Sequence, residues 1–174
     1  IDPAGGVIDT VIYGPDNSDG FEDDDGVVTS SVAPKPSTDA SLARIPDGVD
    51  TNDSGVDFVV TGSPTMGAAN ADPCGTKAGD AAGLVINEFI PNPAGTDSDY
   101  EWLELYNGSS SDLDLSGWIV NTGTSSFSKS GIVPTGTQLA AGEFLVLGQT
   151  ETSIPEVDVA VPGFSLGNSG STNA

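Results

Sequence analysis

The sequence predicts an all-β sandwich with long acidic loops. Three stretches alternate in side-chain character with a period of two, which is typical of half-buried strands. They are residues 84–89, 101–107 and 112–120. The 23 glycines and 12 prolines lie among gaps rich in Ser, Thr, Asn and Asp. Because such gaps supply turns, the composition favours a β protein over a helical one.

The alternation also predicts which side chains share a face. In the second stretch the two sets are Trp102, Glu104 and Tyr106 on one side and Glu101, Leu103 and Leu105 on the other. Trp118, in the third stretch, is expected in the sandwich core, with Trp102 nearby or on a flank.

Further short strands are expected in both halves of the chain. They are residues 7–13, 41–45 and 57–61 in the first half and 119–121, 142–147 and 157–161 in the second. Ile8, Thr10 and Ile12 are expected to face the core. The total is close to the roughly seven to nine strands of an immunoglobulin-type sandwich. Neither half is expected to fold well alone, because each would leave an open sheet edge and an uncovered apolar face.

Polar segments separate these strands. Residues 14–26 are a long acidic loop, 27–40 an extended Ser/Thr/Pro-rich segment, 46–55 an acidic turn, 71–83 a linker and 122–131 a polar excursion.

A series of motifs runs through the second half of the chain. They are Ile86-Asn87-Glu88, Asn92-Pro93, Glu101-Trp102-Leu103-Glu104-Leu105-Tyr106-Asn107 and Asp114-Leu115-Ser116-Gly117-Trp118. In order and spacing they resemble the opening half of a lamin tail domain, and residues 142–147 and 164–170 resemble its middle. The resemblance implies an immunoglobulin-like β-sandwich. It also implies a setting in secreted or surface proteins, where the family often occurs as repeats in bacteria and archaea.

Segments of the first half are similar to the second half of the same family. They are residues 1–14, 41–48, 57–60 and 63–70. The resemblance therefore implies a reversed order, with residues 1–70 as the closing half, 71–83 as the linker and 84–174 as the opening half. We expect either a circularly permuted, split sandwich or a unit cut from a longer row of repeats.

The charge of the chain limits its partners. With 26 acidic and 4 basic residues, the formal net charge is −22. Like charge repels nucleic acid and anionic membranes, so neither is an expected partner. No stretch approaches the roughly 20 apolar residues that a membrane helix requires. The charge favours cations, a basic partner or a high-salt environment.

The side chains available for catalysis are few. The chain has no His, which excludes imidazole bases, Ser-His-Asp triads and His-ligated zinc. Paired carboxylates are the remaining option, as Glu101 with Glu104 or Glu88 with Glu101. The favoured interpretation is that these residues cap the sheet faces toward solvent. No catalytic or cofactor-binding residue is predicted, and we expect no enzyme activity.

Calcium is the expected small partner, because it takes about six to eight oxygen ligands, which closely spaced Asp and Asn supply. The acidic loop fits part of a calcium-loop pattern, although Pro15 and Gly26 stand where its end ligands belong. The predicted ligands are Asn17, Asp19, Asp23 and Asp25, with a looser second set at Asp50 and Asn52. The alternative is a set of solvated loops that keep an acidic surface soluble.

Cys74 and two glycosylation patterns leave alternatives open. As the sole cysteine, Cys74 is either a solitary thiol or a crosslink between chains. Asn52 and Asn107 begin patterns for N-glycosylation, which matter only where the organism glycosylates secreted proteins.

Two classes of function follow from these observations. In the first, the chain is an extracellular structural subunit that assembles head to tail, because each copy completes the sandwich of the next. Its partners are then copies of itself or adjacent repeats. In the second, it is an accessory module of a large secreted protein that binds calcium or a surface. The reversed order of the halves favours the first class or a repeat array.

Overall fold

The computed structural model describes residues 1–70, 83–95, 100–123, 126–149 and 154–166. Within these ranges the chain forms ten strands and one helical turn, α1 (Ser54–Asp57). The predicted all-β class is therefore confirmed. The described residues include no helix of the length and apolar character that a bilayer span requires. The predicted linker lies almost wholly outside the described residues, as does Cys74.

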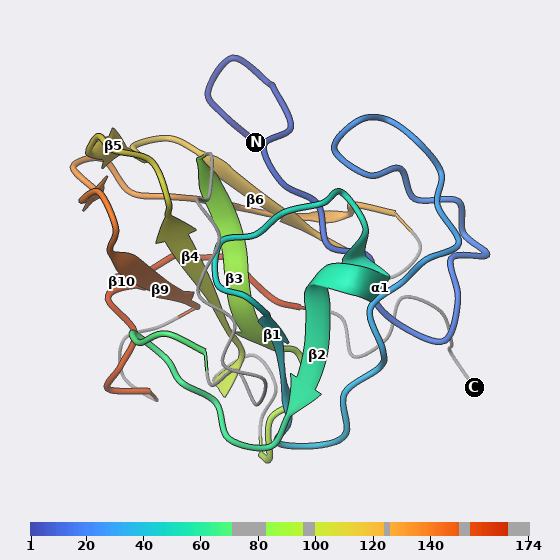
Figure 1. Cartoon of the computed structure of the whole chain (residues 1–174). Coiled ribbons are helices and arrows are strands. Elements are labelled where there is room, and N and C mark those ends of the chain that lie inside the picture. Colours follow the sequence, from blue (N-terminus) through green and yellow to red (C-terminus); the bar gives the residue numbers. More distant parts are fainter. Residues whose placement is uncertain (71–82, 96–99, 124–125, 150–153, 167–174) are drawn as a thin grey trace.

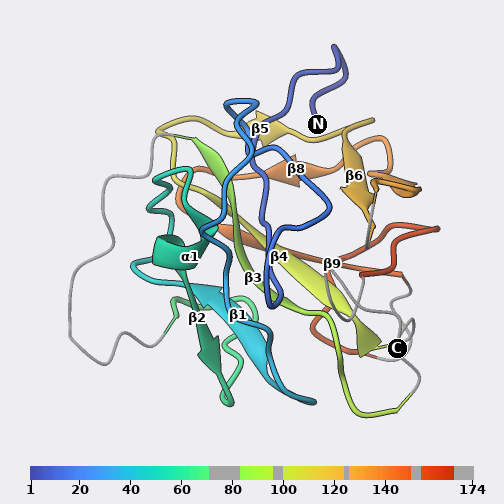
Figure 2. The ribbon, with the colours of Figure 1, turned by 90° about the vertical axis from the view of Figure 1, so that its right-hand side faces the viewer.

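A six-stranded sheet contains strands from both halves of the chain. Its members are β1 (Ser41–Arg44), β2 (Phe58–Thr61), β3 (Leu84–Ile90), β4 (Trp102–Asn107), β9 (Phe144–Gly148) and β10 (Val159–Ala160). Their order in the sheet is β10-β9-β4-β3-β1-β2, and β10 with β9 is the parallel pair (Figure 1). β1 joins β3 in antiparallel register, with Leu42 opposite Phe89 and Ala43 opposite Glu88. The two halves of the chain thus share one sheet, as Figure 2 shows for β2, β1, β3 and β4.

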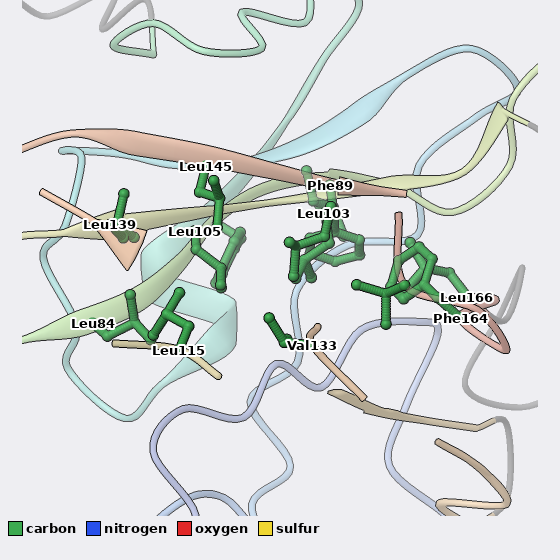
Figure 3. Packing of buried hydrophobic residues seen from close by; sticks show 14 of the residues in the cluster. Leu84, Phe89, Leu103, Leu105, Leu115, Val133, Leu139, Leu145, Phe164 and Leu166 are labelled. Atoms are coloured by element: carbon green, nitrogen blue, oxygen red, sulfur yellow. The ribbon is translucent and has the colours of Figure 1, made fainter. Parts of the chain in front are cut away.

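Two small sheets face this large sheet. They pair β5 (Leu113–Asp114) with β8 (Gln138–Leu139), and β6 (Ile119–Thr122) with β7 (Lys129–Ile132). Leu115 and Val133, from this second layer, lie across the apolar core from Leu103 of the large sheet (Figure 3). The layers therefore form a sandwich, with the main core between them.

Alternation along β4 sends successive side chains to two cores. Leu103 and Leu105 join the main cluster, to which the first half contributes Leu42 and Phe58. Trp102 instead belongs to a smaller cluster, formed with Ile90, Val146, Ile154 and Val157. Trp118 packs half-buried against the main cluster. The face assignments predicted for the Trp and Leu residues are confirmed.

The predicted strand at residues 7–13 is wrong. In this segment a single bridge is formed, from Tyr13 to Ala33. Its polar groups bond elsewhere, since the Ile12 amide donates to Ser54 Oγ and Asp9 accepts from the Ile86 amide. Ile12 is buried and Ile8 packs on the main core, as expected, but Val11 and Tyr13 pack on the main core as well, so no two-residue period survives.

The predicted polar excursion at residues 122–131 is also partly wrong. β7 begins at Lys129 and pairs with β6 from Thr122 opposite Lys129 to Ile119 opposite Ile132. This segment lacks a clean alternation because Ile132 is exposed while Gly131 is buried. The Gly131 position has little room, since an added Cβ would lie 2.5 Å from Val161 Cγ1. The sequence signal for this hairpin is therefore weak.

Candidate functional site between the two halves

The contact between residues 1–70 and residues 83–166 is referred to below as the seam. Its backbone part is the β1 and β3 pairing, and polar side chains extend it on both sides of β1. Two groups of these side chains carry the chemistry: the Arg44 cluster (Asp9, Arg44, Asp50 and Asp57) and the glutamate network (Asp47, Asn70, Asn87, Glu88 and Glu104).

Arg44 is the last residue of β1 and is 1 % exposed. Its guanidinium donates to Asp9 at 2.8 Å, to Asp57 at 2.9 Å and to Asp50 at 3.1 Å. Nε donates to the Ile86 carbonyl of β3 at 2.8 Å, which crosses the seam. Burial of a guanidinium is tolerated when its donors are satisfied and opposite charge surrounds it. The Arg44 cluster is therefore a buried ionic anchor for β1.

Asp9 is held on two sides. Its Oδ2 accepts from Arg44 and, at 2.6 Å, from the Ile86 amide, so this carboxylate also crosses the seam. Its side chain is 4 % exposed, and Oδ1 is buried without a hydrogen-bond partner. Burial raises the pKa of Asp9 to about 7, although the Arg44 charge acts to lower it.

Two further carboxyl groups approach Asp9. Carboxylate oxygens of Asp9, Asp24 and Asp50 lie within 4.8 Å of one another. Asp24 Oδ1 is also buried without a hydrogen-bond partner. Burial raises the pKa of Asp24, and the neighbouring Asp50 charge raises it further. We refer to Asp9, Asp24 and Asp50 as the aspartate triad.

The glutamate network lies along β3 and β4, where Glu88 and Glu104 are opposite each other. Both side chains belong to the second half, and both accept hydrogen bonds from the first. Glu88 accepts from Ser41 Oγ and from the Thr65 amide, and Glu104 accepts from the Gly67 amide. These bonds fasten the segment after β2 onto the sheet.

Two amide side chains complete this network. Asn87 Nδ2 donates to Glu104 at 2.9 Å and to Asp47 at 3.0 Å. Asp47 also accepts from the Asn70 amide at 2.9 Å, and Asn70 Nδ2 donates to the Arg44 carbonyl at 3.1 Å. Burial raises the pKa of Glu104 to about 7, with the Glu88 charge adding to the rise, and burial raises the pKa of Glu88 too. The network joins the halves through neutral donors.

The interpretation of the glutamates as solvent-facing caps is wrong. Glu88 and Glu104 are 0 % exposed and Glu101 is 1 % exposed. Glu101 accepts from the Leu166 amide at 3.0 Å, so it too anchors a loop.

The alternation placed Glu101 and Glu104 on opposite faces of their strand correctly, but it was wrong for Glu88. A register shift between Ile86 and Glu88 breaks the period of β3, so Phe89, and not Glu88, faces the main core with Ile86. The alternation also carried no information about the segments that cover these faces.

Most of the predicted calcium ligands stabilise their own loops. Asn17 Nδ2 donates to the Phe21 and Thr29 carbonyls, and Asp23 Oδ1 accepts from the Val27 amide. Asp25 accepts from Asn52 Nδ2 at 2.6 Å, which ties the acidic loop to the 46–55 turn.

The structure brings one of the predicted ligands into a carboxylate group. Asp50 joins the aspartate triad, whereas Asp19 is exposed and outside it. Asp9 and Asp24 were missed, because Asp9 lay in an assumed strand and Asp24 fell outside the loop pattern. The run Asp23-Asp24-Asp25 was the available signal for Asp24.

A cavity of about 600 Å³ lies beside the seam. Its walls are mostly apolar and come from both halves, including Val11 and Tyr13 from the first and Phe89, Leu105 and Trp118 from the second. The N-terminal segment therefore covers the main core without filling the space above it.

The sandwich and its seam define a class of protein, a β-rich module of immunoglobulin-like architecture. A family model described as Lamin Tail Domain matches residues 77–173. The chain belongs to the lamin tail domain family, whose members are typically non-catalytic. The match does not include residues 1–70, so the reversed order of the halves stays a prediction. Comparison with curated proteins and with solved structures gave no match.

Proposed function

We propose that the chain is a non-enzymatic, extracellular structural subunit that assembles head to tail. Residues 1–70 of one copy, or of one repeat, complete the sandwich that residues 84–174 of the next begin. The observation that carries the proposal is the pairing of β1 with β3 together with its polar bonds. These contacts are specific, and they join parts of the chain that the 71–83 segment separates.

The seam suits exchange between copies because its described contacts come from residues on either side of the 71–83 segment. A segment of thirteen residues reaches at most about 45 Å when extended, which allows the closing half to serve its own sheet or a neighbour's. The donor surface on β1 differs from the acceptor surface on β3. Such a heterologous contact propagates as a filament unless its rotation closes a ring.

Two features support a separable closing half. The cavity beside the seam reduces the number of packing contacts between the halves, because its lining residues have no atoms facing them across the empty volume. Fewer contacts are therefore lost when the closing half leaves its own sheet. The net charge of −22 keeps separate copies soluble before assembly.

A second candidate is a self-closed accessory module within a larger secreted protein. The observation in its favour is that β1 pairs with β3 of the same chain. Such a module would present its acidic loops as a surface for calcium or a basic partner.

Complementation between two variants distinguishes the candidates. Leu42 of β1 and Phe89 of β3 are buried opposite each other. Leu42→Asp should therefore prevent β1 from acting as the donor strand, and Phe89→Asp should prevent β3 from acting as the acceptor. Each variant alone is expected to lose its near-UV circular dichroism. Exchange predicts that an equal mixture, unfolded and refolded together, recovers part of this signal as a dimer in light scattering. Recovery fails if the chain closes only on itself.

Light scattering of the unmodified chain over a range of concentrations gives the second test. Head-to-tail assembly predicts a series of oligomers that grows with concentration, with filaments in electron microscopy. A compact monomer at every concentration contradicts assembly and supports the accessory module.

A further inference from the structure

We infer that the aspartate triad, formed by Asp9, Asp24 and Asp50, binds a calcium ion. This site goes beyond the structural role proposed above and does not depend on it. It also differs from the set of calcium ligands predicted from the sequence, with which it shares only Asp50.

The spacing of the triad fits one ion. Its three carboxylates offer oxygens that lie within 4.8 Å of one another. Calcium binds oxygen at about 2.3–2.6 Å, so two oxygens on opposite sides of one ion are about 5 Å apart. The three groups therefore fit around one calcium ion after little movement, with water to complete its shell.

The unpartnered oxygens give independent support for a cation. Asp9 Oδ1 is buried and has no hydrogen-bond partner, although Asp9 Oδ2 is fixed by Arg44 and by the Ile86 amide. Asp24 Oδ1 is also buried without a hydrogen-bond partner. Burying a carboxylate oxygen without a partner is costly, and a coordinated metal removes that cost. The orphan oxygen on Asp9 belongs to a side chain already held in place, as expected of a preformed ligand.

The charge balance points the same way. Arg44 bonds Asp9, Asp50 and Asp57, and Asp24 is the fourth carboxyl group nearby. With all four ionised, one guanidinium leaves three negative charges unbalanced. A divalent cation reduces this excess to one. Hard oxygen ligands with irregular spacing suit calcium better than magnesium, which requires a near-ideal octahedron.

The triad also links three separate segments. Asp9 lies in the N-terminal segment, Asp24 in the acidic loop and Asp50 in the turn between β1 and α1. Because Asp9 accepts from the Ile86 amide of β3, an ion bound here would fasten the acidic loop and the N-terminal segment to the seam.

Isothermal titration calorimetry with calcium chloride tests the site on the whole chain after treatment with chelator, in buffer of physiological ionic strength. The expected result is a single saturable site. Asp24→Asn should weaken the affinity for calcium at least about tenfold, because the substitution removes one charged ligand. Asp24 is the variant of choice because its Oδ1 has no hydrogen bond to lose, and circular dichroism verifies folding.

Asp19→Asn is the matched control. It removes one charge from the same loop, but Asp19 is exposed and lies outside the triad. The site predicts an affinity within about twofold of the unmodified chain, as expected of an exposed charge that is not a ligand and is screened by salt. At the same calcium concentration, calcium should also raise the thermal midpoint of the unmodified chain and of Asp19→Asn, and raise that of Asp24→Asn less.

Three results would overturn the inference. They are the absence of saturable binding, equal weakening by both substitutions, and loss of binding in Asp19→Asn alone, which would return calcium to the 16–25 loop pattern. Tighter binding of magnesium than of calcium would contradict the choice of ion. None of these outcomes bears on strand exchange, which light scattering tests separately.

Discussion

The Arg44 cluster and the glutamate network fasten the same seam by different chemistry. In the first, a buried guanidinium donates to the carboxylates around it. In the second, Glu88 and Glu104 accept from hydroxyl and amide groups, which carry no charge. Burial raises the pKa of Asp9 in the first group and of Glu104 in the second to about 7. Loss of the partner has different consequences, because it leaves buried charge without its cation in the first group and removes a neutral donor in the second, so the two groups should respond differently to mutation.

The largest expected effect is the loss of Arg44. Arg44→Ala leaves the buried Asp9 and Asp57 carboxylates without their cation, which should lower the free energy of unfolding by about 3–5 kcal/mol. Urea denaturation followed by Trp fluorescence measures this change. Lys129→Ala is the control, because Lys129 is exposed and its loss should stay within about 0.5 kcal/mol. A similar cost for both variants would mean that Arg44 is not a buried anchor.

The glutamate network predicts a pH effect of comparable size. The pKa of Glu104 is raised from 4.5 to about 7, so the folded state binds this proton more tightly than the unfolded state does. The associated stability is fully present below pH 4.5 and is lost as pH rises through 7. The size of the loss is about 3 kcal/mol.

Glu104→Gln isolates this contribution, because its side chain does not titrate. The free-energy difference between the unmodified chain and the variant, measured by urea denaturation from pH 4.5 to 8, should shift toward the variant as pH rises. A difference that is constant over this range would contradict the raised pKa.

Removal of one donor from the glutamate network should have a smaller effect. Ser41 is fully buried, and its hydroxyl donates to Glu88. Ser41→Ala should cost about 1–3 kcal/mol, because it deprives a buried carboxyl group of a donor. Ser63→Ala, at an exposed position, should cost at most about 0.5 kcal/mol. Equal costs in thermal denaturation would argue against the Ser41 bond.

The smallest expected effect is at Asn17 in the acidic loop, which belongs to neither group. Asn17 bonds the Phe21 and Thr29 carbonyls and the Phe21 amide. Asn17→Ala should cost about 1 kcal/mol and speed hydrogen exchange at Phe21, while exchange in β1 and β3 stays unchanged. Faster exchange throughout the sheet would show that the loop is coupled to the seam.

Local pattern predicted the strands well and their polar surroundings poorly. Alternation placed Leu103 and Leu105 together on one face of β4, because a strand requires only a period of two. It gave no means to foresee that Gly67, far along the chain, covers Glu104. The prediction that Asp9 lies in a strand was wrong for the same reason, because its partners Arg44 and Ile86 are distant in sequence. Buried polar groups are defined by long-range partners, which a single sequence does not display.

A disulfide across the seam tests whether the two halves meet at β1 and β3. Ala43 and Glu88 are opposite each other, and facing residues of antiparallel strands have Cα separations of about 4.5–5.5 Å, within the range of a disulfide. Ala43→Cys with Glu88→Cys, in a chain where Cys74 is replaced by Ser, should oxidise readily in air. Ala43→Cys with Val85→Cys, which are not opposite, is the control.

Thiol titration and a non-reducing gel then give the answer. We expect loss of both thiols in the Ala43 and Glu88 pair. The gel should then show a ladder of linked chains if copies exchange halves, and an internally linked monomer if the chain closes on itself. Free thiols in a folded Ala43 and Glu88 variant, or equal oxidation of the control pair, would contradict the seam.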